Sequence, residues 1–272
     1  MSSTPHLPPV AKLEQKNVVD LIARGKRIDE RGPDSYRPIQ IQVGLIEKAN
    51  GSAHVSLGKS KVLVGVKVEV GEPFPDTPDE GVLTVNAELV PLASPSFEPG
   101  PPGEMAIELA RVVDRGIRES KAVDVKSLSI QKGKKVQVVY VDVYVLDHDG
   151  NLIDAAAMAA LGALVNAKVG KFEMKGDEVV VKPGHHPLPI NNYPVAVTLA
   201  KVGKSLLVDP SLEEEQVMSA RLTVTTDKNG FICAMQKGGL SGFTVDELKR
   251  AVELAVQKAA ENRARILAVA KG

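Results

Sequence analysis

Hydrophobic and polar residues alternate through the first third of the chain, which predicts a series of short β-strands. The strands are expected over residues 39–47, 53–57, 62–70 and 82–90. Asn50-Gly51 is a pair typical of a hairpin turn, and Gly58-Lys59 marks the next turn along the chain. This part of the sequence is therefore predicted to form a strand meander.

Apolar residues at helical spacing predict four helices. They are expected around residues 18–22 with an end at Gly25, over residues 104–120, over residues 155–168, and from residue 245 through residue 259 towards residue 268. Asp154 is predicted to be the N-cap of the third helix. Thr244 and Glu247 have the spacing of a capping box at the start of the last one.

The second half of the chain again places strands before a helix. A long strand is expected over residues 136–146, and shorter strands that suggest one sheet are expected over residues 195–201, 205–208, 221–226 and 231–236. Residues 183–194 hold four prolines and are the best candidate for a domain boundary. The chain is predicted to be α+β, with an N-terminal arm over residues 1–29, one domain over residues 30–190 and a second over residues 191–272.

Composition narrows the classes of function. The chain has 272 residues, and its hydrophobic fraction of 43% is ample for a packed core. Lysine and arginine total 34, as do aspartate and glutamate, so any binding of nucleic acid needs a local patch. Aromatic residues make up 3%, which argues against a base-stacking RNA module. The single cysteine, Cys233, excludes an intrachain disulfide and cysteine-rich zinc modules.

The sequence gives no sign of a targeting segment or a metal site. Residues 1–12 lack the apolar stretch of a signal peptide, and the most apolar run, residues 62–70, is too short to span a bilayer. We therefore expect a soluble, cytoplasmic protein without membrane contact. His185 and His186 have no acidic or cysteine residue at ligand spacing, so a solvated loop is favoured over a metal site, and no cofactor is expected.

An acidic cluster follows the second of the short strands. Asp209-Pro210 with Glu213, Glu214 and Glu215 could hold Mg²⁺ against a phosphate group. The interpretation that we favour is structural. In it, Asp209 caps a short helix, Pro210 is its first residue, and the glutamates lie in its first turns, where the helix dipole stabilises negative charge.

Arginines are the most distinctive charged feature of the sequence. Arg111, Arg115 and Arg118 are spaced i, i+4 and i+7, on one stripe of their predicted helix and opposite its apolar face. Arginine binds phosphates in a bidentate manner, so this stripe is suited to a polyanion. The alternative is a surface helix with internal ion pairs, and the residues alone do not decide between the two. The pairs at helical distance are Glu108–Arg111 and Asp114–Arg118.

Several stretches of the sequence carry a family resemblance. The entry segment GKRIDERG at residues 25–32, followed by Tyr36-Arg37-Pro38, resembles that of RNase PH-like proteins, and residues 51–53 with 62–66 fit the first hairpin of that family. The more specific stretches are residues 71–78, 98–102, 106–115 and 146–151. Together they closely resemble the non-catalytic RNase PH-like ring subunits of the archaeal exosome. The resemblance extends from about residue 25 to the last helix.

The resemblance implies an RNase PH-like fold with two βαβ-containing halves, mixed sheets and helices packed on them. It also implies a hexameric ring, a trimer of dimers in which this subunit alternates with a catalytic RNase PH-like subunit, topped by RNA-binding cap proteins. Single-stranded RNA would enter the central channel and be phosphorolysed from its 3′ end to nucleoside diphosphates.

The resemblance further indicates that this chain is not the catalyst. Active members bind phosphate with a Gly-Ser-Arg turn before a buried helix, and the matching positions here hold Asn151, Leu152 and Ile153. Active members also carry two aspartates six residues apart, where this chain has Glu215 and Arg221. Neither a general acid nor a metal scaffold is retained at these positions.

The role implied for this chain is therefore supportive: to complete the ring, to support the active site of the neighbour, and to offer Arg111 and Arg115 to the RNA backbone. Arg118 is added as an RNA contact only because it lies on the same helical stripe.

Two alternatives stay open. One is a phosphorolytic exoribonuclease active by itself, which the missing Gly-Ser-Arg turn disfavours. The other is a stand-alone RNA-binding scaffold, which the lack of an aromatic platform disfavours.

Overall fold

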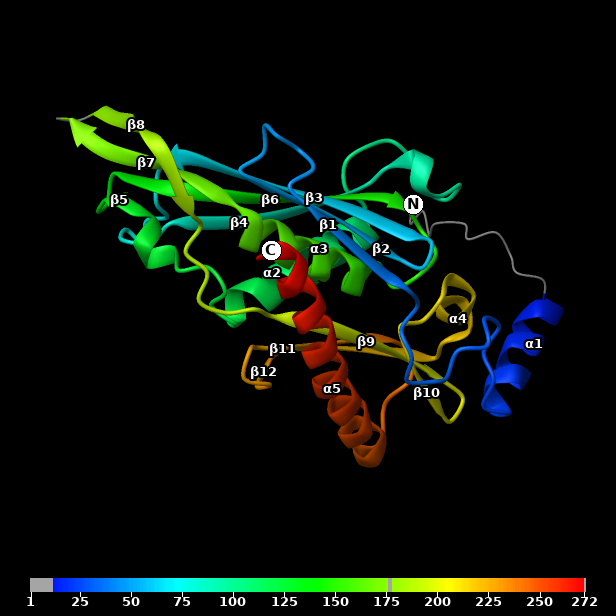
Figure 1. Cartoon of the computed structure of the whole chain (residues 1–272). Coiled ribbons are helices and arrows are strands. Elements are labelled where there is room, and N and C mark those ends of the chain that lie inside the picture. Colours follow the sequence, from blue (N-terminus) through cyan, green and yellow to red (C-terminus); the bar gives the residue numbers. More distant parts are fainter. Residues whose placement is uncertain (1–11, 176–177, 272) are drawn as a thin grey trace.

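The computed structural model describes residues 12–175 and 178–271 and arranges them as two main β-sheets, a separate two-stranded sheet, and helices between and beside the two main sheets (Figure 1). The first sheet has the order β1-β2-β3-β6-β4, with β5 paired to β6. Its strands are β1 (Ile39–Val43), β2 (Gly51–Leu57), β3 (Ser60–Gly71), β4 (Val82–Leu89), β5 (Ser129–Gln131) and β6 (Lys135–Asp147). All neighbours are antiparallel except β4 and β6, which are parallel because the chain crosses over through α2 (Glu104–Glu119) between them.

The second sheet has the order β10-β9-β11-β12, and all its pairs are antiparallel. Its strands are β9 (Val195–Val202), β10 (Ser205–Val208), β11 (Ala220–Thr226) and β12 (Ile232–Gly239). The four short strands predicted from the sequence thus form one sheet. β10 and β11 flank β9 and run in the same direction, joined by the short helix α4 (Leu212–Val217).

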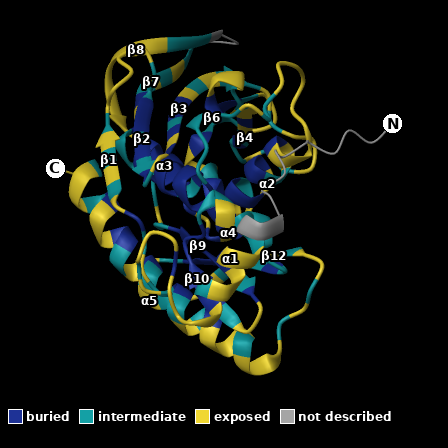
Figure 2. Cartoon of the chain, turned by 90° about the vertical axis from the view of Figure 1, so that its right-hand side faces the viewer, coloured by how far each residue is buried: buried dark blue, intermediate teal, exposed yellow. Residues whose placement is uncertain are grey.

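Helix α3 (Leu152–Asn166) lies between the two sheets and contacts β2 and β3 on one side and β9 on the other. Its alanines and Gly162 allow this close approach, since a Cβ on Gly162 would lie 3.2 Å from the Cβ of Ala53. Helix α5 (Val245–Ala270) packs on β9 and β11 and begins with the predicted capping box. Figure 2 shows the buried residues gathered around α3 and β9, whereas α5 exposes its outer face.

The N-terminal helix α1 (Lys12–Ala23) is attached to the second sheet. Val18 and Ile22 pack against Val202 and Leu207, and Gly25 ends the helical region with a φ of 73°, as predicted. Residues 26–38, which we call the strap, then lead to β1 of the first sheet. The N-terminal part of the chain therefore packs against the second sheet before the chain enters the first strand of the first sheet.

The first hairpin is wider than the sequence predicts. β1 ends at Val43, and the connection to β2 consists of residues 44–50 instead of a tight turn at Asn50-Gly51. The chain turns earlier because Gly44 has a φ of 73°. Asn50 instead joins other strands: its Nδ2 donates to the carbonyl of Lys168, and its Oδ1 accepts from the amide of Val68, both at 2.8 Å.

A further hairpin, β7 (Lys168–Lys175) with β8 (Glu178–Pro187), is missing from the sequence prediction. Helix α3 ends at Asn166, before the predicted residue 168, and residues 183–187 are strand instead of boundary loop. Prolines are tolerated there because β8 pairs only with β7 and so is an edge strand. The hairpin lies largely outside the core, so its hydrophobic and polar residues do not form the clear alternation that predicts a strand.

Candidate functional site

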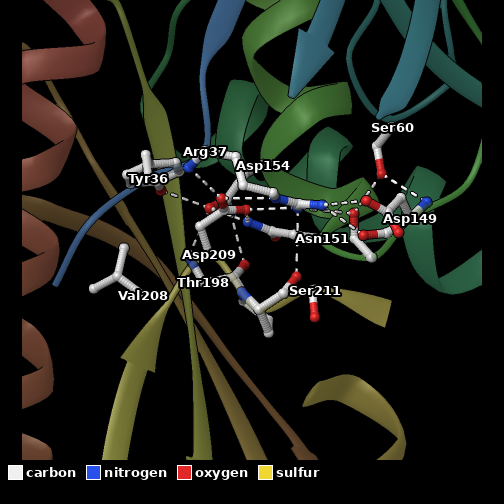
Figure 3. Close-up of polar contacts among 12 residues, drawn as sticks. Tyr36, Arg37, Ser60, Asp149, Asn151, Asp154, Thr198, Val208, Asp209 and Ser211 are labelled. Carbon is white, nitrogen blue, oxygen red and sulfur yellow. Dashed lines mark hydrogen bonds and ion pairs between the residues drawn. The ribbon is translucent and has the colours of Figure 1, made fainter. Parts of the chain in front are cut away.

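Three segments that are distant in the sequence meet beside the start of α3 (Figure 3). They are the strap, the loop of residues 148–151 between β6 and α3, and the turn of residues 209–211 between β10 and α4. The family resemblance places the phosphate-binding turn of active members here, at residues 151–153. If the chain bound inorganic phosphate as active members do, the phosphate would lie in this cluster.

Asp209 lies at the centre of the cluster and is fully buried. Its Oδ2 accepts hydrogen bonds from the backbone N (2.8 Å) and Nε (3.0 Å) of Arg37 and from Nη1 of Arg31 (3.0 Å). Its Oδ1 accepts from Nη2 of Arg37 and from Nδ2 of Asn151, both at 2.8 Å. Two guanidinium groups, one backbone amide and one side-chain amide thus satisfy both carboxylate oxygens.

The prediction that Asp209 caps α4 is wrong. Ser211 is the N-cap: its Oγ accepts from the amide of Glu214 at 3.4 Å, and Oε2 of Glu214 accepts from the amide of Ser211 at 2.9 Å. Pro210 accordingly precedes the cap instead of filling the first helical position. The spacing of Ser211 and Glu214 is a capping box, the signal in the sequence that gives the correct start.

Asp154 is likewise not the N-cap of α3. Asn151 occupies that position in the left-handed conformation, with a φ of 50°, while Asp154 lies in the first turn and points into the cluster (Figure 3). Its carboxylate accepts from Oη of Tyr36 (2.6 Å), Nδ2 of Asn151 (2.9 Å), and N (3.0 Å) and Oγ1 (2.7 Å) of Thr198. Complete burial raises the pKa of Asp154 to about 6, against the opposing effect of these hydrogen bonds.

A second buried ion pair joins the strap to α4. Nε of Arg27 donates to Oε1 of Glu214 at 2.7 Å, and Nη2 donates to Oε2. The same guanidinium donates to the carbonyl oxygens of Val208 and Asp209, each at 2.8 Å. The turn between β10 and α4 is therefore fixed by arginines from the strap at both its backbone and its side chains.

The positions matching the phosphate-binding turn are filled by the protein itself. Leu152 and Ile153 are only 7% and 6% exposed. Gly150, with a φ of 87°, approaches the start of α4 so closely that a Cβ there would lie 2.5 Å from the amide N of Leu212. That amide donates to the carbonyl of Asp149 at 3.1 Å. The loop before α3 and the turn before α4 thus close on each other.

The two positions that hold aspartates in active members also have other partners here. Oε1 of Glu215 accepts from the amide of Asn151 at 2.9 Å, and burial raises the pKa of Glu215 to about 7. Arg221, on β11, donates from Nη2 to Oε1 of Glu108 on α2 at 2.6 Å. One carboxylate therefore binds the loop before α3, and the other position carries a cation that contacts a neighbouring helix.

Arg111, Arg115 and Arg118 are all exposed on α2, as the helical spacing predicts. Nη2 of Arg118 donates to Oδ1 of Asp114 at 2.7 Å and to the carbonyl of Leu83 at 2.9 Å. The structural alternative therefore holds for Arg118, whose guanidinium is engaged within the protein.

The pairing of Glu108 with Arg111 is wrong, because Glu108 pairs with Arg221. Among the residues that the structure describes, Arg111 and Arg115 make no hydrogen bond or ion pair through their side chains. Arg115 lies beside Met235 of β12, where the two help to line a small cavity. The face formed by Arg111 and Arg115 is thus charged, exposed and next to the edge strand of the second sheet.

Other candidates from the sequence form no site. Across residues 12–175 and 178–271, no group of three or more His, Cys, Asp or Glu side chains is placed to hold a metal ion. His185 and His186 lie on strand β8 instead of in a loop. Within the same ranges no helix is long and apolar enough to cross a membrane.

The strap arginines are the residues of the cluster that sequence reasoning missed. Arg27, Arg31 and Arg37 belong to the segment that carries the family resemblance, but the local pattern assigns them no role. Their partners Asp209 and Glu214 lie more than half the chain away, so periodicity and motif spacing could not pair them. The signal that was present is a run of arginines in a polar segment otherwise predicted to be a connector.

Comparison with known proteins shows which family the chain resembles. A sequence profile of the 3′ exoribonuclease family, domain 1 (RNase PH), matches residues 35–170, and one of domain 2 of the same family matches residues 192–258. The chain is 56% identical over 264 residues to the exosome complex component Rrp42 of Pyrococcus horikoshii, covering 96% of each protein. It is 53% identical over 255 residues to the protein of the same name from Methanopyrus kandleri, covering 93% of this chain and 96% of the relative.

Chains of solved archaeal exosome structures are also similar to this chain. A chain from the Archaeoglobus fulgidus exosome with RNA bound to the active site superposes with a TM-score of 0.86 at 47% identity, covering 93% of this chain and 98% of that one. A chain from an archaeal exosome core superposes with a TM-score of 0.83 at 44% identity, covering 94% and 96%. The likeness thus extends over both sheets and nearly the whole sequence.

Proposed function

The chain belongs to the RNase PH family of 3′ exoribonucleases, and from this premise we propose that it is a subunit of an archaeal exosome that does not itself catalyse phosphorolysis. It completes a hexameric ring with a catalytic RNase PH-like partner, supports the active site of that partner, and contacts single-stranded RNA below RNA-binding cap proteins. We further propose the division into an arm over residues 1–29 and two RNase PH-like domains over residues 30–190 and 191–272.

The closed cluster around Asp209 is the observation that carries the non-catalytic role. Phosphorolysis requires an open site for inorganic phosphate and a group that donates a proton. At the position that corresponds to the phosphate-binding turn, Asp209 is paired with the guanidinium of Arg37, and Gly150 packs against the start of α4. A phosphate ion would have to displace this buried carboxylate and its ion pairs, at a cost of several kcal/mol.

The face of Arg111 and Arg115 supports the RNA-binding part of the proposal. Both side chains are exposed, and within the described residues neither has an internal partner, so both are available to phosphate groups. Arg118 contributes less in this proposal because Asp114 and the carbonyl of Leu83 already occupy its guanidinium. Contacts of this kind give affinity without sequence preference, which suits a general degradation complex.

Reconstitution with the catalytic partner tests the proposal. End-labelled single-stranded RNA and inorganic phosphate are supplied to this chain alone, to the partner alone, and to a stoichiometric mixture purified as a ring. We expect no shortening by this chain alone and the strongest shortening by the mixed ring. Shortening by this chain alone would contradict the non-catalytic role, and failure to form a mixed assembly would contradict the ring role.

A further inference from the structure

Arg221 reaches α2 because of the residue beside it on the edge strand. A Cβ on Gly238 of β12 would lie 3.2 Å from Nη2, 3.4 Å from Nε and 3.5 Å from Cζ of Arg221. The arginine side chain therefore passes closely over the backbone of Gly238. At its far end Nη2 donates to Oε1 of Glu108 at 2.6 Å, and the two side chains are 15% and 42% exposed.

Glu108 has a second possible partner on its own helix. Arg111 is three residues further along α2, at the spacing where opposite charges pair on an isolated helix. In the structure this pair is not made, and Arg111 is exposed without an internal partner among the described residues. The carboxylate is bound to β11 instead of to its neighbour on the helix.

We propose that Arg221 is a positioning residue for RNA binding, because it holds Glu108 away from Arg111 and so keeps the Arg111 guanidinium free for an RNA phosphate. The inference rests on the proposed RNA contact of Arg111. It gives a role to the cation that stands where active family members have an acid. Arg221 also neutralises a carboxylate that would otherwise repel RNA beside the contact.

The surroundings of Arg221 show that Glu108 is what orients it. Nε of Arg221 is buried and has no hydrogen-bond partner in the part of the chain that the structure describes. The bond from Nη2 to Glu108 therefore anchors the guanidinium. When Arg221 is removed, Glu108 loses this partner and is free to pair with Arg111.

The test is a double-variant cycle in the ring assembled with the catalytic partner. Single-stranded RNA binding is measured by fluorescence anisotropy over a range of salt concentrations for the wild type, the double-cycle variants Arg221→Met, Glu108→Gln and Glu108→Gln/Arg221→Met, and the separate variant Arg111→Ala. We expect Arg221→Met to bind RNA about twofold more weakly, with the slope of log K against log salt flatter by up to about 0.7. The double variant should return to near the wild type, because an uncharged glutamine does not hold Arg111.

Lys201→Met is the matched control. Lys201 on β9 pairs with Glu247 at the same distance of 2.6 Å, so its loss removes one positive charge and one ion pair without releasing a carboxylate onto α2. Its RNA affinity should equal that of the wild type. Ring assembly of each variant is checked by light scattering, and if Arg221→Met does not assemble, the cycle is run with Arg221→Gln.

The outcomes separate this inference from the function on which it rests. If Arg111→Ala weakens RNA binding but Arg221→Met does not, the positioning role is wrong and the RNA contact of Arg111 stands. Equal weakening in Arg221→Met and in the double variant would also overturn the positioning role, since Arg221 would then act through its own charge or packing. If Arg111→Ala has no effect, the proposed RNA contact itself fails.

Discussion

The side-chain Nδ2 of Asn151 donates to Oδ1 of Asp209 at 2.8 Å and to Oδ2 of Asp154 at 2.9 Å. One amide thus links a carboxylate before α4 to a carboxylate inside α3. The environments of the two acids differ: Asp209 binds two guanidinium groups, whereas the donors to Asp154 among the described residues are all neutral. The cluster is therefore an internal network that holds the two halves of the chain together.

Asp209→Asn should destabilise the protein strongly, because Arg37 and Arg31 would keep their charge without a buried counter-charge. We expect a loss of about 3–5 kcal/mol in the free energy of unfolding, measured by chemical denaturation. Asp147→Asn is the matched control, since Asp147 forms an exposed pair with Lys61 at 3.0 Å and should cost less than about 1 kcal/mol. Equal losses in the two variants would show that the cluster contributes no more than a surface pair.

Gly150→Ala tests how closely the loop before α3 approaches α4. The φ of 87° is unfavourable for alanine, and the added Cβ would lie 2.5 Å from the backbone N of Leu212. Gly203→Ala has a φ of 60° but no atom within 4 Å of the added Cβ, so it reports the conformational cost alone, about 1 kcal/mol. We expect Gly150→Ala to cost at least about 2 kcal/mol more than this control in thermal and chemical denaturation. Equal costs would mean that the two loops are not in tight contact.

Glu215→Gln should change the pH dependence of stability. The pKa of Glu215 is raised to about 7 by burial, above the ordinary value of 4.5, so the folded chain binds this proton more tightly than the unfolded chain does. Ionisation therefore removes stability as pH rises from about 4.5 to 7. Glutamine does not ionise and keeps the oxygen that accepts from the amide of Asn151.

Urea unfolding across this pH range measures the effect. Glu215→Gln should match the wild type near pH 4 and exceed it by about 1–3 kcal/mol at pH 8. Glu213→Gln, at an exposed neighbouring position, controls for the loss of one carboxylate from α4. A Glu215→Gln effect of the same size at both pH values would contradict the proposed cause.

The fold could be predicted well where local pattern and burial agree. The strands of the second sheet, the arginine stripe of α2 and the capping box of α5 depend on periodicity or on neighbours three or four residues apart, and the structure contains all three. The prediction failed where partners lie far apart in sequence. Asp209 is a residue type that often caps helices, but it instead binds Arg31 and Arg37, which lie far away in the N-terminal part of the sequence.

The same limit applies to the candidate site. Helical spacing correctly places Arg111 and Arg115 on an exposed face, but it also pairs Glu108 with Arg111, the nearest cation along the helix. The pairing that forms is with Arg221, because the second sheet folds against α2 and Gly238 leaves room for the arginine to cross. Tertiary structure, and not helical spacing, therefore decides that Glu108 is paired with Arg221 and that Arg111 is left without this partner.

The arginine face itself gives the final prediction. In the assembled ring, Arg115→Ala should weaken binding of single-stranded RNA about three- to tenfold and flatten the salt dependence by about 0.7, because one free guanidinium is lost to the phosphate backbone. Arg118→Ala should have a smaller effect, since its guanidinium is already bound to Asp114 and Leu83. Arg265→Ala, an exposed arginine on α5, controls for the loss of one surface charge and should leave RNA affinity unchanged. If the three variants bind RNA equally, overall charge and not the α2 face governs binding.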